Sequence, residues 1–159
     1  MGIIEILNKY PFLVKRIHEI QEQIAEIEDK KKNLENTLKA TQITDMPKNP
    51  NITDMVSEIA VKLVQYTNQI TRLRDEELEL TLQKMKVDNF LNDLEPDKAV
   101  IVKLRHFERK DFRQIASEVF LSKSRVWEKY QEAIKELENR TKTGQEIGKN
   151  GQIWGKHVV

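Results

Sequence analysis

Residue types that could do chemistry gather near the carboxyl end, at the start of a helix predicted over residues 122–138. The candidates are Ser122, Lys123, Ser124, Arg125, Trp127, Glu128, Lys129 and Gln131. Lysine and arginine bind phosphates and guanine edges, while small polar and planar side chains contact other bases in the DNA major groove. The first turns of an exposed helix are the part that reaches those edges. The segment therefore predicts a surface that contacts duplex DNA.

A second group of cations precedes this helix. Arg113 lies on a short predicted helix, and Arg109 and Lys110 lie in the loop before it. Cations placed beside a base-contacting helix commonly hold the phosphate backbone. Simpler roles are open as well. Arg109, Lys110 and Arg113 can serve solubility, Ser122 and Ser124 can do no more than cap their helix, and Trp127 can shield the helix predicted to begin at Pro96.

Three predicted helices position these side chains. Pro96 suits the first turn of one helix, Asp111 suits the N-cap of the next, and Ser122 can cap the third by accepting a backbone N–H. Their apolar positions recur at helical spacing: Ala99, Val100, Val102, Leu104 and Phe107; Phe112, Ile115, Ala116 and Val119; Val126, Tyr130, Ala133, Ile134 and Leu137. Together they predict a helix-turn-helix module over residues 93–140.

This part of the chain resembles region 4 of bacterial sigma factors. The resemblance rests on Leu94-Glu95-Pro96, residues 100–107, Ile115-Ala116, residues 121–126, Ala133-Ile134 and Leu137. With Asp45-Met46-Pro47 ahead of a long helix, the chain is similar to the sigma-like regulators of phages and prophages of Gram-positive bacteria, the autolysin-regulator-like and late-gene-activator families. That resemblance implies DNA-binding control of phage transcription.

One residue departs from that pattern. Phe120 stands where many such modules place a glycine in the turn. A bulky residue at positive φ is costly, so the turn is expected to differ in geometry or the phenylalanine to help pack it.

Residues 1–92 are predicted to form an amino-terminal arm and a long antiparallel coiled-coil hairpin. Asn8 is the expected cap of a helix reaching about Lys39, and residues 44–51, with two prolines, are expected to break it before a second helix to Asn92. Mostly apolar heptad positions alternate by three and four in both: Leu13, Ile17, Ile20, Ile24, Ile27, Lys31, Leu34 and Leu38, then Val56, Ile59, Leu63, Tyr66, Ile70, Leu73, Glu77, Leu80, Lys84, Val87 and Leu91. The overall expectation is an all-α fold.

The hairpin carries two further expectations. In an antiparallel pairing centred near Met46, Glu77 falls opposite Lys15 and Arg16, which would fix the register, or else leans to the surface. A second apolar stripe of Leu78, Leu82 and Met85 needs another partner, and a homodimer is the favoured one.

Charge is unevenly distributed along the chain. The net charge is +1, but residues 1–90 hold 13 cationic against 15 acidic side chains, whereas residues 91–143 hold 12 against 10. The mild positive balance of the second segment is in the direction expected for a protein that binds nucleic acid. It is far from the strongly basic charge of a non-specific binder. No cysteine is present, which excludes disulfides, thiol catalysis and cysteine-ligated metals.

No catalytic arrangement is recognisable, so the chain is predicted not to be an enzyme and to need no cofactor or metal. His18, His106 and His157 lie in three separate segments, which does not suit a metal site. Without a long apolar run the chain is expected to be cytoplasmic. Residues 141–159, with four of the five glycines, are expected to be a flexible tail.

Three function classes remain open from the residues. The first is a sequence-specific transcription regulator that binds double-stranded DNA and presents its hairpin to a second copy or to host RNA polymerase. The second is a phage DNA-packaging protein similar to small terminase subunits, which assemble as rings. The third is a coiled-coil adaptor that does not bind DNA. Whether transcription is raised or lowered is not encoded in any recognisable motif.

Overall fold

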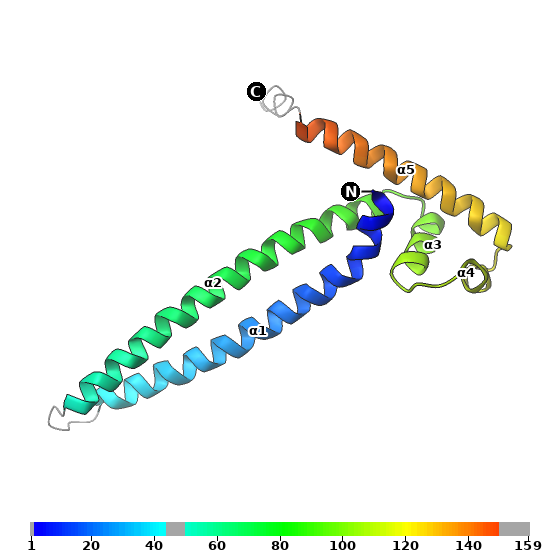
Figure 1. Ribbon diagram of the computed structural model, residues 1–159. Helices are drawn as coiled ribbons and strands as arrows, with labels where there is room; N and C mark the ends of the chain where they lie inside the picture. The colour runs from blue at the N-terminus through cyan, green and yellow to red at the C-terminus, as the bar shows by residue number, and fades with distance from the viewer. Residues whose placement is uncertain (1, 44–49, 150–159) are drawn as a thin grey trace. The chain divides into compact units, whose positions relative to one another are not determined.

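A computed structural model describes residues 2–43 and 50–149, and these residues form five α-helices and no strand (Figure 1). They are α1 (Ile3–Ile43), α2 (Pro50–Asn92), α3 (Pro96–His106), α4 (Phe112–Val119) and α5 (Lys123–Lys149). The prediction of an all-α fold is confirmed. Within the described residues, no helix combines the length and apolar character needed to cross a membrane.

The chain divides into two compact units. One comprises Met1–Leu13 with Gln83–Val159, and the other comprises Val14–Leu82. The sequence-based division at residue 92 differs from this one, because the last turns of α2 belong with α3, α4 and α5. Residues 150–159, the greater part of the expected tail, lie outside the described residues, as do residues 44–49 of the expected helix break.

In the unit Val14–Leu82, α1 and α2 run antiparallel, and the heptad positions are the least exposed ones. Ile20, Ile24 and Ile70 form its buried cluster. The other heptad residues described here are buried or half-buried, including the polar Lys31 and Glu77, while the positions between them are mostly exposed. The three-four spacing therefore correctly predicted which face of each helix is covered.

Polar contacts beside this seam differ in detail from the sequence-based expectation. Arg16 pairs with Glu76 in a two-bond contact, Nε to Oε1 at 3.0 Å and Nη2 to Oε2 at 3.2 Å. Glu77 instead accepts a hydrogen bond from Gln21 at 3.1 Å. The predicted pairing of Glu77 with Arg16 is wrong, because the planar guanidinium takes both oxygens of the carboxylate that flanks the seam, where both groups keep access to water.

In the other unit, α3, α4 and α5 pack pairwise on one another and share a core with the first turns of α1 and the last turns of α2. The fully buried members are Leu7, Leu91, Ile101, Val102, Ile115, Val126, Ala133 and Leu137. Val100, expected in the apolar face of α3, is 45% exposed, and Ile101 is buried in its place. Because α3 contacts both α4 and α5, its covered face is centred on Ile101 and Val102 rather than on Val100.

Helix α1 begins at Ile3, so the expected cap at Asn8 is wrong. Pro11 lies inside the helix. An interior proline costs about 3 kcal/mol, but burying Ile3 and Leu7 in the core gains roughly 1.5–3 kcal/mol for each side chain. The two burials together outweigh the proline, so the helix continues through it.

His106, at the end of α3, joins three helices of this unit. Its side chain is buried, with Nδ1 2.8 Å from Asn8 Oδ1 and Nε2 2.9 Å from the Tyr130 hydroxyl. A neutral ring satisfies both contacts, since Nδ1–H can donate to the amide oxygen while Nε2 accepts from the phenol. Burial lowers the pKa of His106 below its ordinary value of 6.5, and the charge of Arg105 lowers it further.

The stability of the chain is expected to fall in mild acid because of His106. The unfolded chain binds this proton more tightly than the folded one, so the stabilisation is complete above pH 6.5 and is lost as the pH falls through the lower folded pKa. Urea unfolding at about pH 7.5 and about pH 5.5 measures the loss. His106→Gln should cost about 1–3 kcal/mol at the higher pH and remove this part of the pH dependence. His18→Gln, at an exposed histidine, should keep it.

Candidate nucleic-acid interface

Two predicted caps set the start of α4 and of α5. Asp111 accepts a hydrogen bond from the Gln114 backbone N–H at 2.8 Å, and the Gln114 side chain accepts one from the Asp111 N–H at 3.0 Å. Ser122 Oγ accepts from the Arg125 N–H at 3.2 Å. These side chains satisfy backbone donors that the first turn leaves unpaired, so both helices begin where the sequence predicted.

The apolar stripe of α5 determines which side chains face outward. Val126, Tyr130, Ala133, Ile134 and Leu137 are all buried, as predicted. Most candidate residues on the remaining surface of α5 are exposed: Ser122, Lys123, Ser124, Arg125, Trp127, Glu128 and Gln131. The first two turns of α5 are therefore accessible rather than covered by the residues that the structure describes.

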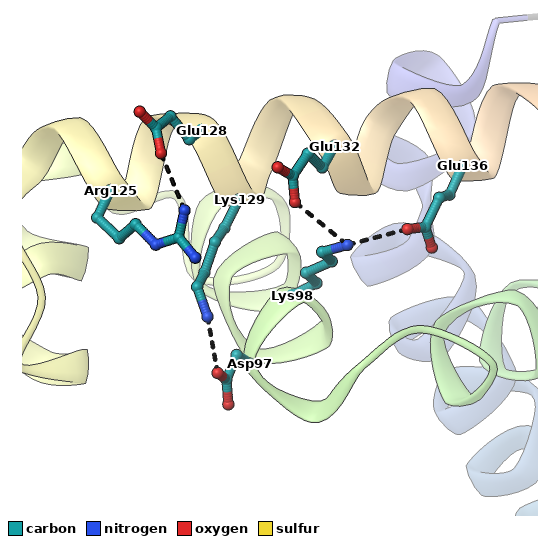
Figure 2. Close-up of polar contacts among 7 residues, drawn as sticks. All are labelled: Asp97, Lys98, Arg125, Glu128, Lys129, Glu132 and Glu136. Carbon is teal, nitrogen blue, oxygen red and sulfur yellow. Dashed lines mark hydrogen bonds and ion pairs between the residues drawn. The ribbon is translucent and has the colours of Figure 1, made fainter.

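Figure 2 shows the ion pairs along the side of α5 that faces α3. Lys129 Nζ lies 2.8 Å from Asp97 Oδ2. Lys98 Nζ lies 3.3 Å from Glu132 Oε2 and 2.9 Å from Glu136 Oε1. The hydrogen bond from Lys129 lowers the pKa of the Asp97 carboxyl. Because the Lys129 side chain is only 14% exposed, it holds α5 against α3 and differs in this from the other candidates.

The two cations at the start of α5, Lys123 and Arg125, differ in whether they have an ion-pair partner. The Lys123 side chain makes no hydrogen bond or ion pair within the described residues. Arg125 Nη1 lies 3.0 Å from Glu128 Oε2, and both side chains are more than half exposed. An exposed pair of this kind is worth about 0–1 kcal/mol, so replacing Glu128 by a phosphate or a base edge costs Arg125 little.

Trp127 packs against α4. Its ring meets Phe112 edge-on at 5.2 Å, and the side chain is 49% exposed. Trp127, Phe112, Lys123, Ser124 and Glu128 line a shallow hollow at the junction of the two helices. Part of the Trp127 side chain therefore supports the pair of helices, and about half of it is accessible.

The three cations before and on α4 also differ in how far their charges are already paired. Lys110 is paired with Glu108 at 3.1 Å and also with Glu118, so its charge is largely satisfied within the loop and helix. Arg109 is exposed, with its guanidinium carbon 5.8 Å from the Phe12 ring centre. Arg113 is exposed and makes no hydrogen bond or ion pair among the described residues. Of the three, Arg113 is the most available to an anion.

Phe120, in the turn between α4 and α5, departs from both expectations for it. Its backbone has φ 57° and ψ 41°, the left-handed conformation, and its N–H donates to Ala116. The side chain is 92% exposed. The turn thus keeps the geometry that usually takes glycine, and the phenyl ring does not help to pack it.

The described residues include two groups that sequence reasoning did not find. One is the His106 contact with Asn8 and Tyr130, where residues 98 positions apart in the chain meet. The other is the set of ion pairs from Asp97 and Lys98 to α5. Neither has a local signal, because both depend on how α3 lies against other helices.

No family model, curated protein or solved structure matches this chain.

Replacing Phe120 by glycine is expected to stabilise the protein. Left-handed backbone costs a residue with a Cβ roughly 1–2 kcal/mol, and the exposed ring contributes little burial to offset that. Glycine's extra freedom in the unfolded chain removes part of the gain, leaving about 1 kcal/mol. Thermal unfolding of Phe120→Gly, compared with Phe120→Ala, measures the effect. The alanine variant keeps its Cβ and should gain nothing; equal gains in both would assign the effect to the ring instead.

Proposed function

We propose that this protein is a sequence-specific DNA-binding regulator of transcription, with α4 and α5 acting as a helix-turn-helix and the first turns of α5 entering the major groove. The observation that carries the proposal is the exposed start of α5, where Lys123, Ser124 and Arg125 are exposed and about half of Trp127 is accessible. Side chains of these types can contact base edges and the adjacent phosphates.

Helix α4 would hold the duplex while α5 contacts the bases. Arg113 is exposed and unpaired within the described residues, which suits a phosphate contact. Arg109 can join from the preceding loop, whereas Lys110 and Lys129 contribute mainly by bracing the fold.

The transcriptional role in this proposal follows from the resemblance of residues 93–140 to sigma region 4, and a phage or prophage gene is its expected target. The unit Val14–Leu82, with its heptad seam, would act as a coiled-coil hairpin that presents a surface to a second copy or to RNA polymerase.

Removing the two leading cations is expected to abolish specific DNA binding. Each base contact of this kind is worth about 1–3 kcal/mol, so Lys123→Ala with Arg125→Ala should weaken binding roughly 5- to 150-fold for each residue removed. Fluorescence anisotropy with fragments selected from phage and host DNA by the wild-type protein gives the affinities. Circular dichroism should show unchanged helicity, since both side chains are exposed.

The matched control removes two cations from the same helix, further along. Lys135 and Lys142 are exposed, and Lys135 lies twelve residues, about 18 Å, beyond Lys123. Lys135→Ala with Lys142→Ala makes the same charge change and should keep most of the affinity. Equal affinity of the first variant and the wild type would refute the assignment of α5. If the DNA fragments selected by the wild-type protein are packaging sites rather than promoters, the proposed function changes from regulation of transcription to DNA packaging.

A further inference from the structure

A second line of side chains runs along α2 in the unit Val14–Leu82, away from the seam. It alternates by three and four and consists of Val61, Val64, Asn68, Thr71, Asp75, Leu78 and Leu82, all exposed. We call this set the outer stripe. Its four apolar members are 53–60% exposed, which is unusual for side chains at regular spacing on one helix face.

We propose that the outer stripe is a homodimer interface, in which α2 packs antiparallel against α2 of a second copy of this chain.

The order of apolar and polar side chains in the outer stripe is nearly the same when read in either direction, as self-pairing in an antiparallel arrangement requires. Two apolar residues stand at each end, and the polar residues stand in the middle. An antiparallel pairing centred on Thr71 places Val61 opposite Leu82, Val64 opposite Leu78 and Asn68 opposite Asp75. A two-fold interface requires that each patch fit its own copy in this reciprocal way, and the alternation by three and four is the spacing of knobs-into-holes packing.

Charge complementarity selects the antiparallel direction. Neither Arg72 nor Asp75 makes a hydrogen bond or ion pair within the described residues. Helical side chains lean toward the amino terminus, so in the antiparallel pairing Arg72 reaches back toward Asp75 of the second copy. A parallel pairing would instead set Asp75 against its own copy, and two facing carboxylates repel.

The outer stripe extends the apolar stripe that sequence reasoning named. Leu78 and Leu82 belong to both, while Val61 and Val64 add the second apolar end that self-pairing needs. The interface gives a definite form to the second-copy contact proposed for this unit. It does not depend on DNA binding, since it involves neither α4 nor α5, and its test contains no DNA.

Sedimentation equilibrium over a range of concentrations tests the dimer. The full chain should approach twice its mass of 18.7 kDa. Asp75→Arg should shift the equilibrium at least tenfold toward monomer, because four cations then face one another. Arg72→Asp combined with Asp75→Arg should restore the dimer by exchanging the partners. Asp29→Arg, on an exposed and unpaired position of α1, makes the same charge change and should leave the mass unchanged.

Engineered cysteines test the direction, because the chain has none of its own. Val64→Cys and Leu78→Cys should each form little disulfide alone but cross-link when mixed, since residue 64 faces residue 78 of the other copy. Disulfides form only between Cα atoms about 4.4–6.8 Å apart. Efficient cross-linking of Val64→Cys with itself would overturn the antiparallel arrangement. A wild-type monomer, or an assembly larger than a dimer, would overturn the interface itself.

Discussion

The burial of one face of α5 is the constraint on which the candidate interface depends. Val126, Tyr130, Ala133, Ile134 and Leu137 are held in a core supplied by α3, α4 and the ends of α1 and α2. Once that face is fixed, the rotation of α5 about its axis is fixed too, and the side chains at its start have only one direction to face. Apolar packing thereby decides which polar groups are available, although it contributes no polar contact of its own.

Electrostatics divides the candidate cations into two groups. Lys129 and Lys110 are paired with acidic residues of the same unit, and Arg125 has only an exposed glutamate beside it. Lys123 and Arg113 are unpaired in the described part of the chain. Many cations thus stabilise the fold, which leaves a modest positive charge to attract any anion. Such a surface depends on the placement of a few contacts rather than on a strong field.

The sequence predicted those features that depend on neighbours along one helix. Asp111 with Gln114 and Ser122 are local caps, and the three-four spacing of isoleucines and leucines depends only on helical periodicity. These signals gave the starts of α4 and α5 and the covered faces of α1 and α2.

Features that depend on packing between helices were missed or misplaced. Asn8 was expected to cap a helix, yet it contacts His106, and the burial of Ile3 and Leu7 overrides both that cap and Pro11. Lys129 was grouped with the exposed cations, although Asp97 on α3 captures it. Phe120 adopts the left-handed backbone conformation that its turn requires, although a residue with a large side chain disfavours that conformation. In each case a distant residue or the fold as a whole outweighed the local preference.

Helix α5 is longer than the sequence predicted. It was expected to end at residue 138, but it continues as one helix to Lys149. Arg140 lies 2.9 Å from the Asp93 carboxylate, and this contact ties the later part of α5 to the end of α2. Twenty-seven helical residues form a rod about 40 Å long. Each residue turns the rod by about 100°, so the orientation of its far end is coupled to that of its first turns. One inserted residue would rotate one end against the other, whereas seven would nearly restore the original phase.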